Sequence, residues 1–266
     1  MKKQIFLPEF GNHLNYSVLG KGKPVMLLHG LCEDRKIWQY HGNILAENYR
    51  VIIPDLPGYG ESAPFLDADF SLEKISDVLF FLADQAGMDS FAVVGHSMGG
   101  YTGLAMAQKH PERIQSLCLF HSTARADSEE KKKNRERAVK VFIQNRELFF
   151  RELFKNLFHT ERLDEFIPQI HQLLQDSKKI EDNTLKGTLI ALRDRKDRIE
   201  FLKTYPGHLS YFIGRHDNVL PAKGLIEEAE LLDAHIHVSE QSGHMGFYES
   251  PQETAKYLSE FLEQTF

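Results

Sequence analysis

The segment Phe91–Gly100 constrains the fold of this 266-residue chain more than any other. An apolar, β-branched run ends there in a Gly-x-Ser-x-Gly motif centred on Ser97, and a helix-compatible stretch follows directly. Strand, sharp turn and helix in this order are typical of a nucleophile elbow, which holds its serine in a strained backbone conformation. Gly95 and Gly99 fit such a turn, because a Cβ at either position would collide with the neighbouring strand and helix. We therefore expect Ser97 to present its hydroxyl as a nucleophile, the alternative being a plain glycine-rich turn.

A serine hydroxyl is a weak nucleophile until a neighbouring base takes its proton, so the motif requires a histidine and an acid further along the chain. A buried strand over 208–214 leads into a loop that carries Asp217, and a strand over 234–239 leads into a loop that carries His244. The order serine, acid, histidine is the one expected for this elbow. Because open α/β sheets place their sites beyond the carboxyl ends of the strands, we expect Asp217 and His244 at the same sheet edge as Ser97.

Other residues compete for these two roles. His96 and His216 stay open as alternatives for the base, although their neighbours direct both away from the expected position. Asp217 could instead be a turn aspartate that caps local amides. Asp127 is the rival acid, but the run Asp127-Ser128-Glu129-Glu130 fits a helix N-cap better. Five further histidines stand in polar or amphipathic surroundings and are expected at the surface: His13, His41, His110, His159 and His171.

An acyl-transfer intermediate also needs two preorganised N–H donors. The backbone amide of Met98 supplies one at the start of the helix after the elbow. A strand over 24–28 runs into His29-Gly30-Leu31, where Gly30 permits the turn that aims the Leu31 amide inward. We expect His29 to brace this loop through side-chain hydrogen bonds.

Taken together, the chain resembles the α/β-hydrolase superfamily, specifically its compact, lidded esterase, lactonase and C–C hydrolase branch. The resemblance runs over nearly the whole chain and is carried by five segments: His29-Gly30, Asp55–Ser62, the elbow, Gly214-x-x-Asp217-x-x-x-Pro221 and Gly243-His244. It implies a catalytic triad of Ser97, His244 and Asp217, an oxyanion hole from the Leu31 and Met98 amides, and neither cofactor nor metal. Relatives that break halides or epoxides carry aspartate at the nucleophile position, so Ser97 argues against both activities.

Length and composition agree with one catalytic domain that carries an insertion. A net charge of −6 without a basic stripe gives no indication of nucleic-acid binding. Cys32 and Cys118 form no disulfide framework, and we expect reduced core thiols. The N-terminus is too short and soon too polar for a signal peptide, and no apolar run is long enough to span a membrane. These features favour a cytoplasmic protein, and they leave the oligomeric state open.

Strand and helix patterns alternate as far as residue 122 and predict an α/β fold: a mostly parallel central sheet with helices on both faces. An antiparallel edge pair is expected over 5–7 and 14–19, and a helix over 71–86. From 123 to 206 the composition becomes rich in Lys, Glu, Leu and Phe, which predicts an inserted, all-helical lid. The expected helices of the lid cover 128–144, 147–158, 163–176 and 183–202. The core domain would then comprise 1–122 and 207–266.

The lid carries an aromatic series in which Phe150 and Phe154 share one helix face with Phe158. These rings could pack within the lid, or Phe150 and Phe154 could wall an acyl pocket together with Trp38, which could equally be a helix-packing residue. The basic run that starts at Lys131 is expected to be a solvated helix face. The arginines within 193–198 would be carboxylate binders only if the substrate were charged.

We therefore expect a serine hydrolase that cleaves a small or medium carboxylic ester through an acyl-enzyme intermediate. A lactonase, a C–C bond hydrolase or an acyltransferase with the same triad is the first alternative. A non-catalytic ligand-binding protein with the same fold is the second.

Overall fold

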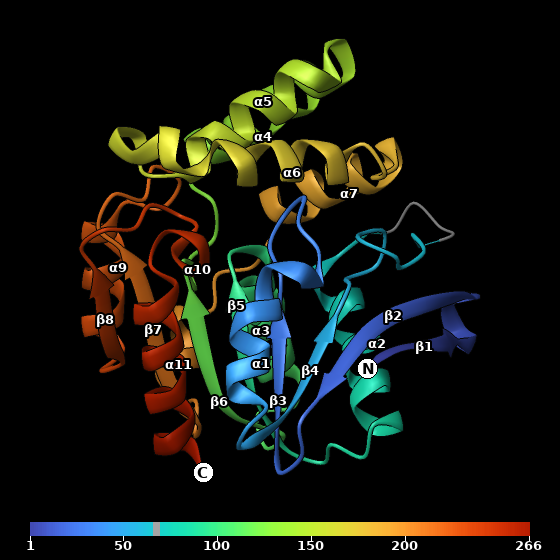
Figure 1. Cartoon of the computed structure of the whole chain (residues 1–266), viewed down its shortest axis with the longest axis vertical. Helices are drawn as coiled ribbons and strands as arrows, with labels where there is room; N and C mark the ends of the chain where they lie inside the picture. Colours follow the sequence, from blue (N-terminus) through green and yellow to red (C-terminus); the bar gives the residue numbers. More distant parts are fainter. Residues whose placement is uncertain (66–69) are drawn as a thin grey trace.

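The computed structural model describes residues 1–65 and 70–266. Within this part of the chain, eight strands form one sheet in the order β1-β2-β4-β3-β5-β6-β7-β8 (Figure 1). The strands are β1 (Lys2–Leu7), β2 (Asn12–Leu19), β3 (Lys23–Leu28), β4 (Tyr49–Pro54), β5 (Phe91–His96), β6 (Ile114–Phe120), β7 (His208–Gly214) and β8 (His235–Ser239). Pairing is antiparallel at β1–β2 and β2–β4 and parallel from β4 to β8, which confirms the predicted edge pair and the mostly parallel sheet.

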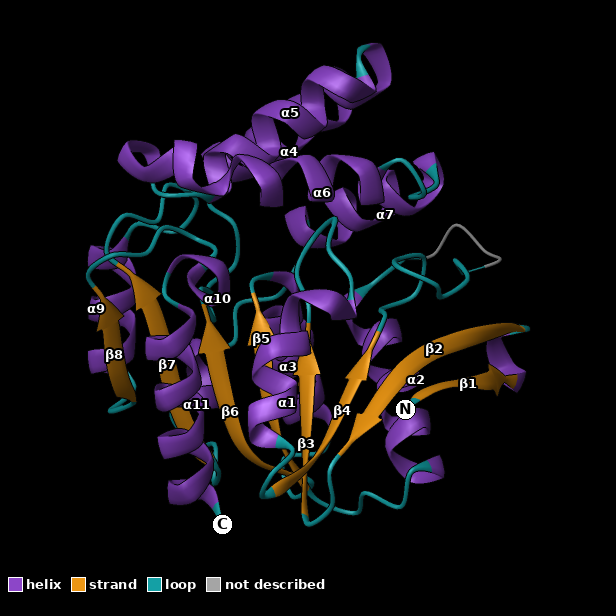
Figure 2. Cartoon of the chain, in the orientation of Figure 1, coloured by secondary structure: helices purple, strands orange, loops and turns teal. Residues whose placement is uncertain are grey.

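Helices cover both faces of the sheet. Helices α1 and α11 pack together in front of it, and α2 and α3 pack together behind it (Figure 2). The helices around the sheet are η1 (Pro8–Phe10), η2 (Arg35–Trp38), α1 (Gln39–Leu45), α2 (Leu72–Gln85), α3 (Met98–Lys109), α9 (Ala222–Leu231), α10 (Gly246–Glu249) and α11 (Pro251–Thr265). All six residues of β5 are buried, as expected for a central strand covered on both faces. The predicted α/β class is confirmed.

The chain between β6 and β7 is helical and lies over the carboxyl ends of the parallel strands (Figure 1). Its elements are α4 (Glu129–Gln144), α5 (Arg146–Leu157), η3 (Thr160–Phe166), α6 (Ile167–Ser177), α7 (Asp182–Arg193) and α8 (Ile199–Leu202). We call this segment the helical insertion; the domain boundaries at 122/123 and 206/207, and its action as a lid, stay predictions.

Two expectations for the insertion were wrong in detail. The stretch expected as one helix over 183–202 is divided between α7 and α8, because the backbone turns where Arg195 reaches to Asp127 and where the Arg198 N–H donates to the Ala124 carbonyl oxygen. The cap of α4 is Ser128, whose hydroxyl accepts the Lys131 N–H, and not Asp127.

No helix among the described residues is long and apolar enough to cross a bilayer.

Candidate active site

Ser97 lies between β5 and α3 in a strained conformation, with φ +49° and ψ −111°. A Cβ on Gly95 would strike the backbone of Gly99 and Gly100, and one on Gly99 would come within 2.5 Å of the Leu28 carbonyl oxygen. The expected need for both glycines is therefore confirmed. The Ser97 hydroxyl makes no hydrogen bond to any other described residue, so it is available to an incoming group.

The strain at Ser97 is held by backbone contacts on both sides. The Ser97 N–H donates to the Phe120 carbonyl oxygen at 3.0 Å, and the Ser122 hydroxyl donates to the Ser97 carbonyl oxygen at 2.9 Å. The elbow is thus tied to the end of β6 and to the loop that follows it.

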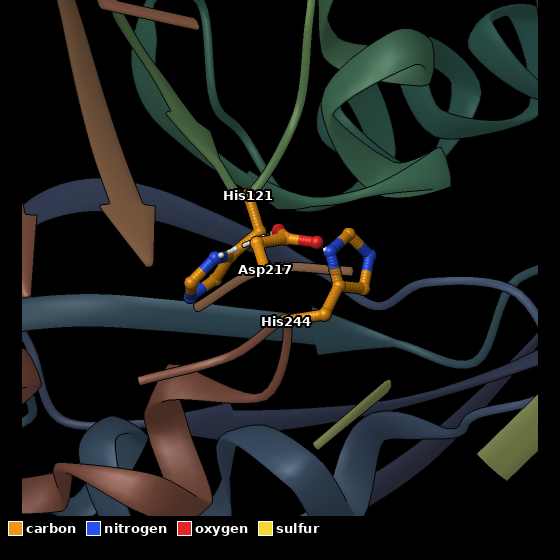
Figure 3. A group of neighbouring side chains, drawn as sticks. All are labelled: His121, Asp217 and His244. Carbon is orange, nitrogen blue, oxygen red and sulfur yellow. Dashed lines mark hydrogen bonds and ion pairs between the residues drawn. The ribbon is translucent and has the colours of Figure 1, made fainter. Parts of the chain in front are cut away.

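Asp217 and His244 form a buried pair at the same edge of the sheet (Figure 3). The His244 Nδ1 atom lies 2.6 Å from Asp217 Oδ2, while Asp217 Oδ1 accepts the N–H groups of Val219 and Leu220 at 2.8 Å each. Burial alone would raise the pKa of Asp217. The charge and hydrogen bond of His244, together with the nearby His121 ring, outweigh it and hold the pKa well below its ordinary value. The carboxylate is therefore ionised and fixed in orientation, as an acid that orients a histidine must be.

His96 brings the His244 loop to the elbow. Its Nε2 atom lies 2.9 Å from the His244 carbonyl oxygen, and the two rings are 5.0 Å apart between centroids. The residue directly before Ser97 therefore holds the backbone of the predicted base. Because no hydrogen bond joins the Ser97 hydroxyl to the His244 ring among the described residues, the triad as a whole stays a prediction.

Glu33 connects the loop after β3 to this cluster. Its Oε2 atom accepts the Gly30 N–H at 2.6 Å and lies 2.9 Å from His96 Nδ1, with all three groups buried. Burial raises the pKa of Glu33, but the charge and hydrogen bond of His96 and the Gly30 N–H bond outweigh it, so the pKa is lowered. The sequence reasoning missed Glu33, which reaches across 63 residues to His96.

The two N–H groups expected to bind an oxyanion are free. Neither the Leu31 nor the Met98 amide donates a hydrogen bond to another described residue. Their role stays a prediction. The bracing role expected of His29 is confirmed: Nδ1 lies 2.8 Å from the Gly30 carbonyl oxygen, and Nε2 accepts the Leu56 N–H at 2.9 Å.

The helical insertion also holds the His244 loop. The His244 N–H donates to the Leu157 carbonyl oxygen at the end of α5, at 2.7 Å. The Glu249 carboxylate accepts three N–H groups, from His159 at 2.6 Å, Gly243 at 2.8 Å and Met245 at 3.0 Å. Glu249 therefore clamps both neighbours of the predicted base to the insertion, another contact that the sequence reasoning missed.

The residues proposed to line a pocket are deeply buried. Trp38 is fully buried against Phe120 and Phe247, with ring centroids 5.4 and 5.5 Å away, which is core packing. Phe150 and Phe154 stack on each other within the insertion at 5.8 Å. Their lining of a substrate pocket stays a prediction.

The rival acid, Asp127, is occupied elsewhere. It pairs with Arg195 at 2.6 Å and with Arg135 at 3.1 Å, and Arg195 lies over the Tyr101 ring. Arg198 likewise pairs with Glu73 at 2.9 Å. These arginines therefore tie the insertion to the core.

Two histidines expected at the surface are buried instead. His41 lies under η2 and α11, with Nε2 3.2 Å from the Pro251 carbonyl oxygen. His159 is covered because it stacks on His216 with ring centroids 3.7 Å apart, at the junction of the insertion and the core. His216 is therefore engaged at this junction.

A third side chain, His121, faces the Asp217–His244 pair, and one ligand atom from each of the three residues lies within 4.8 Å of the others. Such a set could hold a metal ion only if His121 bound it through Nδ1 and carried its proton on Nε2. The Gly246 N–H points at Nε2 from 3.2 Å, so that proton would meet another donor. The donor set fits hydrogen bonds better than a metal.

Comparisons with known proteins agree with this architecture. The family model described as "alpha/beta hydrolase fold" matches residues 23–251. A pimeloyl-[acyl-carrier protein] methyl ester esterase from Legionella pneumophila is 29% identical over 92% of this chain and 97% of its own length. The dihydrolipoyllysine-residue acetyltransferase component of the acetoin cleaving system from Pseudomonas putida is 27% identical over 91% of this chain, and the chain spans only 64% of that relative.

A solved structure shows the same fold at full length. The thermophilic esterase from Thermogutta terrifontis superimposes with a TM-score of 0.91 at 25% identity, covering 100% of this chain and 99% of the esterase. The resemblance drawn from the motifs is thus confirmed over the sheet, the elbow and both later loops. The chain belongs to the α/β-hydrolase fold family.

Proposed function

We propose that this enzyme cleaves a small or medium carboxylic ester by acyl transfer to water. The observation that carries the proposal is the buried, ionised Asp217 bonded to His244, whose loop His96 ties to the strand that ends at a strained serine with a free hydroxyl. A purely structural role would require neither the strained backbone nor the buried charge, because both features lower the stability of the fold.

In the proposed reaction, His244 takes the hydroxyl proton of Ser97 as the serine oxygen attacks the ester carbonyl carbon. The negative charge on the carbonyl oxygen is stabilised by the Leu31 and Met98 amides. His244 then gives the proton to the departing alkoxide, and an acyl-serine ester remains. Water repeats the cycle, so that the acid is released and Ser97 is restored.

Asp217 supports both half-reactions without changing its own protonation state. Its bond to His244 Nδ1 keeps the second ring nitrogen, Nε2, free to accept the serine proton. Its negative charge stabilises the imidazolium that forms. We further propose a cytoplasmic location and an apolar acyl pocket between the insertion and the elbow.

The test is turnover of p-nitrophenyl acetate and butyrate by the wild type, Ser97→Ala and Asp217→Asn, together with labelling by a fluorophosphonate probe. We expect labelling of the wild type only at Ser97, loss of turnover in Ser97→Ala, and a loss of roughly 10⁴-fold in Asp217→Asn. Retained turnover in Ser97→Ala would show that this serine is not the nucleophile. A wider screen that includes lactones and C–C substrates would show whether the same residues serve another acyl substrate.

A further inference from the structure

A second histidine lies against the carboxylate of Asp217, on the other side from His244 (Figure 3). The His121 Nδ1 atom is 3.4 Å from Asp217 Oδ2, the same oxygen that faces His244 Nδ1 at 2.6 Å. All three side chains are buried. The proposed reaction assigns His121 no role.

The hydrogen-bond partners of His121 fix the place of its proton. The Gly246 backbone N–H can only donate, and it points at His121 Nε2 from 3.2 Å, so Nε2 must accept. Burial lowers the pKa of His121 to about 4, against the opposing pull of Asp217, so the ring carries one proton at neutral pH. That proton therefore sits on Nδ1, which lies 3.4 Å from Asp217 Oδ2 but does not complete a hydrogen bond in this conformation.

The surrounding backbone is shaped to hold this ring. His121 follows β6 with φ +46°, in the left-handed region that disfavours side chains, and its N–H donates to the Phe212 carbonyl oxygen at 2.9 Å. A Cβ on Gly246 would lie 2.6 Å from His121 Nε2, and one on Gly214 would lie 2.9 Å from its Cε1. A strained residue and two glycines thus make room for an imidazole at this position. An apolar side chain would fill the same space, so packing alone does not account for a histidine.

We propose that His121 is a positioning residue for the Asp217–His244 pair, donating its Nδ1 proton to the oxygen that His244 also uses. The inference rests on the proposed function. A second donor draws charge from Asp217 Oδ2, so the carboxylate stabilises protonated His244 less strongly. His121 keeps its own proton throughout the reaction.

Two substitutions separate the hydrogen bond from the packing. His121→Phe keeps a planar ring but has no donor. His121→Asn places an amide nitrogen near the position of Nδ1 and tolerates the left-handed backbone. Neither reaches the Gly246 N–H, so both lose that bond equally.

For His121→Phe we expect the acidic limb of the kcat/KM profile to move up by roughly 0.5 to 1 pH unit, the size of one hydrogen bond. The plateau of kcat/KM should fall about 10-fold, as is usual when a supporting partner is lost. His121→Asn should keep the limb near its wild-type position and most of the plateau. His41→Phe is the matched control: burial lowers the pKa of His41 to about 4 as well, yet it lies away from the site, so its profile should keep the wild-type limb.

An unmoved acidic limb in His121→Phe, or an equal shift in His121→Asn, would overturn the inference, because packing alone would then explain the residue. Selective ¹⁵N labelling of histidine in the wild type gives a readout that needs no variant to fold. The Nδ1–H tautomer at His121 is expected, and the Nε2–H tautomer would also overturn the inference. A wild type that is neither active nor labelled by fluorophosphonate defeats the proposed function, whereas an active, labelled wild type with an unmoved His121→Phe profile defeats only the role of His121.

Discussion

Glu249 Oε1 accepts the backbone N–H of His159 at 2.6 Å, and so joins the turn after α5 in the helical insertion to the loop of the predicted base. The same carboxylate accepts the N–H groups on both sides of His244, from Gly243 and Met245. Three backbone donors converge on one buried side chain. The carboxylate is therefore a structural centre of the site, although it touches no reacting atom in the proposed reaction.

This clamp predicts a pH dependence of stability. Burial raises the pKa of Glu249 from 4.5 to about 7, despite its three N–H donors. Between those pH values the folded protein holds a proton that the unfolded chain has lost, so the contribution of Glu249 to stability falls as pH rises from about 4.5 to 7 and is constant above that. The full loss is at most roughly 3 kcal/mol.

Glu249→Gln should remove this slope, because an amide does not titrate. Urea denaturation of both proteins at several values between pH 5 and pH 8 would measure it. We expect the free energy of unfolding of the variant, relative to that of the wild type, to increase as pH rises. Parallel curves would show that Glu249 keeps an ordinary pKa.

The strain at Ser97 predicts that activity and stability conflict at this position. Ser97→Gly should be more stable than Ser97→Ala by about 1 kcal/mol, since only glycine adopts φ +49° without cost. Both variants should be inactive. Thermal melts of the two inactive proteins compare them directly, and equal melting temperatures would mean that the turn stores no strain.

The Asp127–Arg195 pair predicts a strong coupling between the two ends of the helical insertion. Both side chains are buried, so Asp127→Asn should leave the Arg195 charge uncompensated and destabilise the protein by about 3 kcal/mol. Adding Arg195→Met should recover part of that loss, because the double variant buries no charge. A double-mutant cycle from urea melts would test this, and additive losses would argue that the pair does not interact.

Substitution of Phe154 distinguishes a role in lining the substrate pocket from a role in packing the insertion. It is fully buried and stacked on Phe150, so Phe154→Ala should cost roughly 3–5 kcal/mol of stability. Phe261→Ala, at a buried position of α11 outside the insertion, should cost a similar amount. Turnover of p-nitrophenyl esters from acetate to octanoate then tests whether the ring contacts the acyl chain. A changed chain-length optimum in Phe154→Ala alone would place the ring at the pocket. An unchanged optimum in both variants would show that the ring serves packing only.

The candidate site residues that the sequence indicated are those that depend on local pattern. Ser97, Asp217 and His244 each follow a strand, and the ends of strands can be predicted from apolar runs and turn residues. Glu33, Glu249 and His121 were missed, since each acts through contacts that only the folded chain creates. His121 did carry a signal, as it directly follows the strand after the elbow.

Burial was the least predictable property. His41 stands in a polar stretch, and only the packing of η2 and α11 covers it. The break between α7 and α8 likewise depends on Arg195 reaching Asp127, 68 residues earlier in the chain, which no helical period reveals.

The bond from the His244 N–H to the Leu157 carbonyl oxygen has an evolutionary consequence. An insertion joined to the core only through its two connecting segments could be exchanged between relatives without disturbing the core. Here a foreign module would have to place a backbone carbonyl and a backbone N–H where Leu157 and His159 hold the base loop. Recombination with a relative should therefore yield active chimaeras only when the end of α5 and the Gly243–Glu249 segment are inherited together.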